Sequence, residues 1–195
     1  MKKAGTLFTT ALTVAAQTLC LFVSSRVVTA NADPPVFEKV FSQKFSEIAI
    51  ENPNGRTEAE TWNSTRVRVT ASRGSGTSVS APLESRLRFQ VTDTDLRISV
   101  RGEGIDGTIN LLDYVPRQVN LAVRSETEAV AIKGITSSLS VETESGQISL
   151  SVPQNTNADL SLRSIEGTTS SELEMRVFGP VNAHSLDGKI GRGGV

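Results

Sequence analysis

The chain has 195 residues, of which 37% are hydrophobic, 5% aromatic and 21% charged, and its formal net charge is −1. This composition is typical of one soluble domain of ordinary size, and it excludes a collagen-like chain and, with one cysteine, a disulfide-framed one. The single histidine leaves the common zinc and haem sites almost without ligands, so we expect no metal and no cofactor.

Residues 1–32 have the pattern of a signal peptide. Lys2 and Lys3 precede a long uncharged run rich in Leu, Val and Phe, which ends near Ala30-Asn31-Ala32. The small residues at the first and third positions of this triplet suit signal peptidase, so we expect export and cleavage after Ala32. The alternative is an uncleaved membrane anchor, because about 20 apolar residues can span a bilayer.

The remaining segment, 33–195, is mildly acidic and has no cysteine. Removing residues 1–32 takes away three basic residues and no acid, so 17 basic residues stand against 21 acidic ones and the formal charge is −4. A negative surface repels phosphate backbones, so nucleic acid is not expected as a partner. Without thiols, this domain must be stabilised by burial and hydrogen bonding alone.

A repeat of about twenty residues runs through the domain. The copies share apolar first and third positions, Ser, Thr or Asn at the fifth, and usually Gly at the eighth. They lie at 48–55, 121–130, 139–148, 160–169 and 181–190, with a looser copy at 67–74. The apolar positions alternate with period two, so each copy predicts a short strand that buries one face and exposes residues such as Glu142, Arg163 and His184.

The polar and glycine positions of the repeat have a structural explanation. A glycine at the eighth position, such as Gly55, Gly146 or Gly188, predicts a turn that needs positive φ. The Ser, Thr or Asn at the fifth position can hydrogen-bond the turn backbone or its counterpart in the next copy.

Two all-β architectures use these parts. A β-solenoid stacks the copies as parallel strands, which the matching fifth position favours, and it would place Val141, Leu162 and Ala183 on one interior line. An antiparallel sandwich or meander would instead close hairpins at Asn-Gly and Asp-Gly dipeptides. Residues 75–120 are irregular, with strand-like pieces at 87–91, 96–100 and 108–116, and we expect 171–178 to be extended.

The start of the domain resembles a known family. The segment 45–55, with Asn52-Pro-Asn54-Gly55, is followed by Trp62 and by the alternating stretch 67–71, and this succession is similar to the opening of the bacterial adhesin-like domains called Toastrack. Their later repeats also resemble 139–148. The resemblance covers about 40–74 and 119–192 and leaves 75–118 unassigned. It implies a right-handed β-solenoid of short strands in the bacterial envelope, with no established enzymatic activity, and it transfers no catalytic residue.

The end of the chain departs from that family. Its members usually continue for further repeats, whereas this chain stops at 191–195. We therefore expect either that the 33–195 domain is C-terminally incomplete or that its last coil is left open, and an open solenoid end invites self-association unless it is capped.

Two features of the irregular segment raise the question of chemistry. The G-x-G-x-x-G stretch 102–107 follows a strand but precedes another strand, so the helix that a dinucleotide site needs is missing. The same segment holds four carboxylates and a basic partner: Asp93, Asp95, Asp106, Asp113 and Arg117. Together they could form a cluster that cleaves polysaccharides, and Asp93 with Asp95 could bind calcium, although we expect all of them to lie in solvated loops.

Two single residues are weighed in the same way. His184 is predicted to point outward and has no identifiable Ser or Cys partner, which disfavours nucleophilic catalysis. Trp62 lies between two predicted strands, where we expect it to fill a corner rather than to stack on a sugar.

The sequence therefore favours an exported, non-enzymatic envelope or surface protein whose repeat face binds an envelope protein, a glycan or another copy of itself. We predict no catalytic, cofactor or metal residues and a location in the periplasm, at the cell surface or outside the cell. One alternative is a secreted carbohydrate-active β-helix enzyme, which needs two acids about 5 to 10 Å apart on one face. Another is an envelope-stress sensor held to the membrane by an uncleaved N-terminus.

Overall fold

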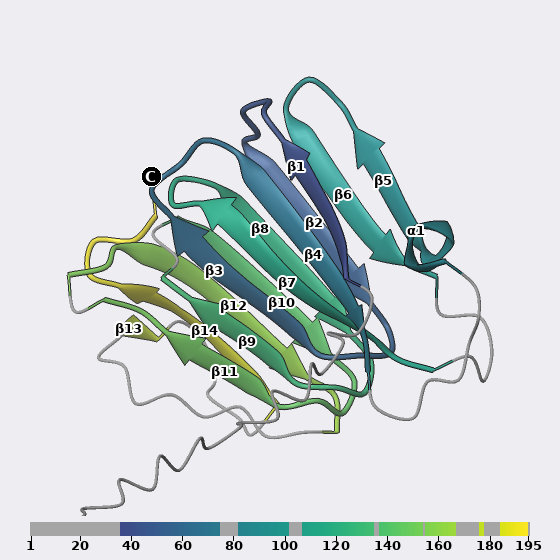
Figure 1. Cartoon of the computed structure of the whole chain (residues 1–195). Coiled ribbons are helices and arrows are strands. Elements are labelled where there is room, and N and C mark those ends of the chain that lie inside the picture. The colour runs from purple at the N-terminus through teal and green to yellow at the C-terminus, as the bar shows by residue number, and fades with distance from the viewer. Residues whose placement is uncertain are drawn as a thin grey trace, which may run out of the picture. The chain divides into compact units, whose positions relative to one another are not determined.

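The computed structural model describes residues 36–74, 82–101, 107–134, 137–153, 155–166, 176–177 and 184–194. Their regular elements are β-strands, apart from the short helix α1 (Leu83–Arg86). The strands form two mixed sheets (Figure 1). The prediction of an all-β protein is therefore confirmed.

Sheet A has six strands. In sheet order they are β1 (Phe37–Phe41), β4 (Val67–Arg73), β7 (Ile109–Pro116), β3 (Thr57–Trp62), β9 (Val130–Lys133) and β11 (Ile148–Ser151). The last four are parallel to one another, whereas β4 is antiparallel to β7 and β1 is antiparallel to β4. The sheet is thus parallel from β7 to β11 and antiparallel from β7 to β1.

Sheet B has eight strands. In sheet order they are β13 (Arg176–Val177), β14 (Ser185–Ile190), β12 (Ala158–Ser164), β10 (Ser138–Thr143), β8 (Asn120–Ser125), β2 (Glu47–Asn52), β6 (Asp95–Val100) and β5 (Leu87–Val91). The five strands from β12 to β6 are parallel, and β5, β14 and β13 are antiparallel to their neighbours. Of the expected extended segment 171–178, only Arg176–Val177 is described, and it is a strand.

Four copies of the repeat lie side by side in register in sheet B. The rows of opposing residues are Ile48–Leu121–Leu139–Leu160, Ile50–Val123–Val141–Leu162 and Asn52–Ser125–Thr143–Ser164. Val141 and Leu162 are therefore neighbours on one interior line, as predicted, while Ala183 lies outside the described residues. For these copies the expectation that like residues stack on like is confirmed.

Two other copies do not stack in parallel, so the prediction is wrong for them. The 67–74 copy forms β4, which is antiparallel to both of its neighbours in sheet A. The last copy supplies β14, which begins at Ser185 and runs antiparallel to β12, with Leu186 opposite Leu162. A period of two specifies which face is buried, but it does not specify the direction of the partner strand.

The segment that looked irregular also contributes strands. β5 and β6 coincide with the strand-like pieces at 87–91 and 96–100, and β7 with the strand expected at 108–116. Leu96 of β6 lies opposite Ile48 of β2, and Leu111 of β7 lies opposite Thr57 of β3. Strand β6 thus joins sheet B and strand β7 joins sheet A, although their sequences lack the polar and glycine positions of the repeat.

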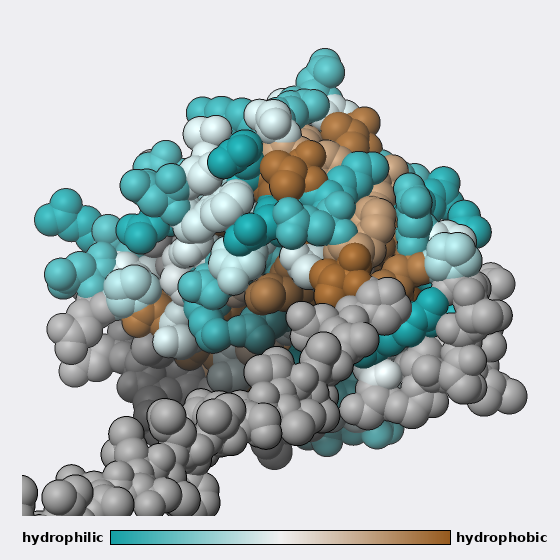
Figure 2. Space-filling model, viewed as in Figure 1, coloured by the Kyte–Doolittle hydropathy of each residue, from teal (hydrophilic) through white to brown (hydrophobic). Residues whose placement is uncertain are grey.

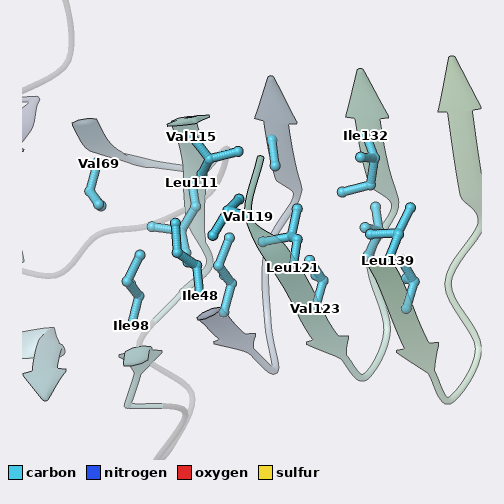
Figure 3. Close-up of a cluster of buried hydrophobic side chains, with 14 of the residues drawn as sticks. Ile48, Val69, Ile98, Leu111, Val115, Val119, Leu121, Val123, Ile132 and Leu139 are labelled. Carbon is cyan, nitrogen blue, oxygen red and sulfur yellow. The ribbon is translucent and has the colours of Figure 1, made fainter. Parts of the chain in front are cut away.

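The core lies between the inner faces of the sheets and is mainly aliphatic. Alternate side chains of each strand are buried in it, including Ile48, Leu121 and Leu139 from sheet B and Leu111 and Ile132 from sheet A (Figure 3). Among the described residues, the aromatic part of the core lies near β1 and β5. There Phe37, Phe41, Phe45 and Phe89 form ring contacts with centroids 5.4 to 6.2 Å apart.

The buried polar side chains at the fifth position of the repeat form hydrogen bonds with backbone at and beside the turns. The Asn52 side-chain amide lies 2.9 Å from the Ile109 carbonyl oxygen and 3.0 Å from that of Gly55. In a later copy the Gly146 N–H donates to Thr143 Oγ1 over 2.9 Å. These bonds to turn backbone confirm the role expected for the fifth position.

The glycines at the eighth position have different reasons for being there. Gly55 has φ of +138°, and a Cβ at this residue would lie 2.0 Å from the Ile109 carbonyl oxygen. Gly146 does not have positive φ, but its Cβ would lie 2.1 Å from the Glu128 carbonyl oxygen of the preceding copy. Gly188 lies inside β14 and not in a turn. The prediction of a positive-φ turn is thus confirmed for Gly55 and wrong for the other two.

Candidate functional site

The outward side chains of sheet B form rows that cross the strands. One row alternates in charge, from Glu51 through Arg124 and Glu142 to Arg163. Arg124 Nη2 lies 2.8 Å from Glu142 Oε2, and the hydrogen bond and charge of Glu142 raise the pKa of Arg124. Arg97 Nη1 lies 3.8 Å from Glu51 Oε1. We call Glu51, Arg124, Glu142 and Arg163 the charged row.

Shallow hollows adjoin the charged row. One of about 230 Å³ has the small outward residues Ala49, Ala122 and Ser140 in its floor, and Glu47 and Arg124 among its walls. Another, of about 360 Å³, is lined at the turns by Arg124, Glu142 and the 61%-exposed Ile165, among others. Both are open and share Arg124, so this face can accept a chain that lies across the strands.

The outer face of sheet A carries a compact aromatic and cationic group at the ends of β3 and β7. The ring centroids of Trp62 and Tyr114 are 5.6 Å apart, and the planes are inclined at 40°. The Arg68 guanidinium carbon lies 4.5 Å from the Tyr114 centroid and 5.2 Å from that of Trp62. The indole N–H donates to the Arg66 carbonyl oxygen over 2.8 Å, which fixes the ring. We call Trp62, Arg68 and Tyr114 the aromatic–arginine cluster.

Figure 2 shows one face of the molecule coloured by hydropathy. Hydrophobic side chains occupy several small areas there, separated by hydrophilic ones. Isolated apolar residues of this kind are ordinary on protein surfaces. Hydrophilic side chains therefore separate the apolar areas on that face.

Of the acids singled out from the sequence, those that the structure describes are not all gathered at one place. Asp93 and Asp95 are exposed at the turn between β5 and β6, where Gln43 Nε2 donates to the Asp93 carbonyl oxygen over 2.8 Å. Asp113 lies on the inner face of β7, and Arg117 is exposed just beyond that strand. Asp106 is outside the described residues. Within the described ranges, no group of three or more His, Cys, Asp or Glu residues is arranged to hold a metal.

Asp113 is a carboxyl group enclosed in the core. It is 0% exposed and lies between Ala59 of β3 and Val69 of β4, and neither of its carboxyl oxygens has a hydrogen-bond partner in the described part of the chain. Burial raises its pKa well above the ordinary value, because the charged form loses its hydration. Such a group is a source of pH-dependent stability and not an accessible catalytic carboxylate.

The remaining sequence candidates are placed as follows. His184 is exposed directly before β14. The 102–107 stretch is described only at Gly107, and β7 follows it as the sequence predicted. Trp62 is half-buried at the end of β3 and closes the turn to β4 through its indole hydrogen bond, but its ring lies on the outer face of the sheet.

Sequence reasoning missed Arg68 and Tyr114 as partners of Trp62. The alternation in 109–116 places Tyr114 on the outward face, and that in 67–73 does the same for Arg68. What the pattern lacked was the antiparallel pairing of β4 with β7, which sets Arg68 opposite Tyr114. No residue type in either strand signals that pairing.

Neither a known protein family nor a curated protein matches the sequence. Among solved structures, the chain is similar to a "putative cell adhesion protein" from Clostridium sporogenes, with 9% identity over 65% of this chain and 76% of that one and a TM-score of 0.39. It is also similar to a "putative adhesin" from Parabacteroides distasonis, with 15% identity, coverage of 60% and 57%, and a TM-score of 0.33. A "putative adhesin" from Bacteroides fragilis has 11% identity, coverage of 67% and 73%, and a TM-score of 0.35.

These similarities are partial. The chain spans a little over half of the Parabacteroides protein, with 57% coverage. At such identities and TM-scores the comparison assigns no ligand and no activity to this chain. Among the residues with described structure, no helix is both long and apolar enough to cross a membrane.

Proposed function

We propose that this protein is an exported, non-enzymatic binding or scaffolding module of the bacterial envelope or surface, similar in role to adhesins. Its domain would be a right-handed solenoid in which the strand pairs β2–β3, β8–β9 and β10–β11 are successive rungs. The observation that carries the proposal is the charged row, which repeats outward side chains at the strand spacing across sheet B.

The spacing and charge of that row favour an extended protein partner. Neighbouring strands are about 4.8 Å apart, so consecutive members of the row present acid and base at a short, regular interval. A partner segment with alternating charge can match this order, and such complementarity contributes to specificity and association rate. The flanking hollows leave room for its side chains. We therefore propose an envelope protein as the partner of this face.

Export is supported by the basic and apolar pattern of residues 1–32 and is tested separately. The full chain is expressed in a bacterial host, and the exported product is analysed by N-terminal sequencing. A product that begins at Asp33 is expected. A product that retains Met1 and stays with the membrane would contradict cleavage and would support the anchored alternative.

Binding by sheet B is tested with a charge swap. The double variant Arg124→Glu with Glu142→Arg keeps the net charge and an ion pair, but it breaks the alternation of the row into two acids followed by two bases. We expect the amount of protein retained by the isolated cell envelope to fall about tenfold, a loss of about 1.4 kcal/mol. The matched control swaps Arg56 and Glu58, which pair at the start of β3 in sheet A.

The control decides how the result is interpreted. If the Arg56 and Glu58 swap lowers retention as much as the Arg124 and Glu142 swap does, recognition by sheet B is wrong. If binding instead depends on the concentration of the protein itself, the partner is a second copy of the chain and the envelope-protein assignment fails.

A further inference from the structure

The only Trp and the only Tyr of the chain meet on the outside of sheet A. Register explains how: Tyr114 lies between Arg68 of β4 and Glu60 of β3, and Trp62 is the outward residue that follows Glu60. The next strand, β9, has Lys133 opposite Glu60. Stacking of the strands therefore does not require aromatic residues at these outward positions.

The cluster is held in place before any ligand arrives. Its indole is fixed by the hydrogen bond to Arg66, and the guanidinium of Arg68 is packed against both rings. Arg68 Nε is enclosed and has no hydrogen-bond partner within the described chain. Rigid aromatic residues contribute contact area with little loss of conformational entropy on binding, which is why they are frequent at recognition sites.

The charges around the cluster favour an anion. Arg68 forms no ion pair with the residues described, and Arg66 and Arg117 are exposed nearby in sequence and register. A guanidinium that stacks on aromatic rings keeps N–H donors in its plane for a carboxylate, which it can bind through two hydrogen bonds. Glu60, beside Tyr114, supplies acceptors for hydroxyl groups.

We infer that the aromatic–arginine cluster is a binding site for a carboxylated saccharide, a sugar chain that carries uronic acid groups. The carboxylate binds Arg68, and the C–H face of the sugar ring packs on Trp62 and Tyr114. The rest of the sugar chain lies in a shallow hollow of about 330 Å³, whose lining includes Glu60, Arg117 and Lys133. An acidic peptide would satisfy the charge of Arg68 but would leave the aromatic pair unexplained.

This inference is independent of the function proposed for the charged row, because the two surfaces belong to different sheets. Either can fail without the other. It also reverses the expectation from sequence that Trp62 serves only to fill a corner.

Trp62 gives a direct measurement, because intrinsic tryptophan fluorescence reports on this site alone. The full chain is titrated with oligogalacturonate and, as a matched ligand, with the same oligosaccharide methyl-esterified at its carboxyl groups. We expect a saturable fluorescence change with the acid form, weakened by added salt, and a Kd at least about tenfold higher for the ester.

Two variants test the role of Arg68. Arg68→Gln, which removes the charge, is expected to raise the Kd for oligogalacturonate at least about tenfold. Arg68→Lys, which keeps the charge but loses the planar stack, is expected to bind with intermediate affinity. The control Arg88→Gln removes an exposed arginine from β5 of sheet B and should leave the Kd unchanged. If Arg68→Gln does not fold, the lysine variant and the two ligands still decide the matter on folded protein.

Three results would overturn the inference. The first is no fluorescence change with oligogalacturonate up to about 5 mM. The second is equal affinity for the acid and ester forms. The third is binding of poly-glutamate as tight as that of oligogalacturonate, which would assign the site to acidic peptides instead.

Discussion

The stacked repeat copies in sheet B and the β1–β4–β7 part of sheet A differ in how far their buried polar side chains are hydrogen-bonded. In the stack, the buried Thr143 accepts the Gly146 N–H, and Asn52 lies within bonding distance of turn carbonyls. In the other region, Asp113 is buried without a partner among the described residues, and the aromatic–arginine cluster lies outside. In the stack the buried side chains therefore make bonds to backbone, although Asn52 Oδ1 has no partner among the described residues, whereas in the other region both oxygens of a carboxyl group are left without one.

The largest effect should come from breaking the aliphatic core of the stack. Leu121 is 1% exposed and lies between Ile48 and Leu139, so Leu121→Ala leaves a cavity. We expect a loss of about 2–5 kcal/mol in the free energy of unfolding, measured by urea denaturation. Leu111→Ala in β7 is the counterpart in the other region, with an expected loss in the same range.

The same pair of variants tests whether the two regions share one core. A single transition that shifts in both variants is expected, because one cluster of buried residues includes Leu121 and Leu111. Two separate transitions, each sensitive to only one variant, would contradict a common core. Ser140→Ala on the outer face is the control and should change stability by less than about 0.5 kcal/mol.

The next largest effect is a gain in stability, expected when the buried carboxyl group of Asp113 is replaced. Burial raises the pKa of Asp113, so the native state keeps this proton to higher pH than the unfolded chain does. Its contribution to stability is complete below the unfolded pKa of about 3.9 and is lost as pH rises toward the folded pKa. Asp113→Asn should therefore match the wild type at about pH 3.5 and be more stable at about pH 8.

The surroundings of Asp113 leave little to offset this dependence. Val69 and Ala59 flank it, and the inward residues of β2 and β6 that are buried opposite sheet A are uncharged. In its own inward row, Lys39 lies beyond Val69, with its ammonium over the rings of Phe41 and Phe89. Equal pH slopes of the unfolding free energy in the variant and the wild type would show that Asp113 has another partner.

A smaller effect is expected for a polar group that the stack satisfies. Thr143→Val keeps the shape of the side chain but removes the acceptor of the Gly146 N–H. We expect a loss of about 1 kcal/mol, measured by urea denaturation at neutral pH. An increase in stability would mean that interior polar groups cost free energy in both regions, and the contrast between them would disappear.

Much of the stack could be predicted from the sequence. The match of Leu121, Leu139 and Leu160 at a fixed offset from Ser or Thr indicated both the strands and their register. The prediction failed for the copies at 67–74 and 181–190, because alternation specifies a buried face and gives no strand direction. It also missed how β6 and β7 join the sheets, because their pairing with β2 and β3 follows from packing and not from likeness of sequence.

The candidate sites were less accessible to sequence reasoning. The charged row follows from the repeat, because its members share one position of each copy. The aromatic–arginine cluster joins three strands that are distant in the chain, and only the tertiary pairing of β4 with β7 brings it together. Alternation in 109–116 does place Asp113 inward with Leu111 and Val115, so the burial of Asp113 could have been inferred from the sequence. That its carboxyl oxygens have no partner among the described residues could not have been inferred, because this depends on the neighbouring strands.

The most direct test of the central claim, that repeat copies are stacked in register, is a disulfide between equivalent positions. In a Cys20→Ser background, Arg124→Cys with Glu142→Cys places thiols on directly opposed residues of strands about 4.8 Å apart, within the span of a disulfide. Arg124→Cys with Ser140→Cys is shifted by two residues, to about 7–8 Å. Mild oxidation, followed by mass spectrometry, should cross-link the first pair almost completely and the second poorly. Equal cross-linking of the two pairs, or preference for the second, would contradict the stacked register.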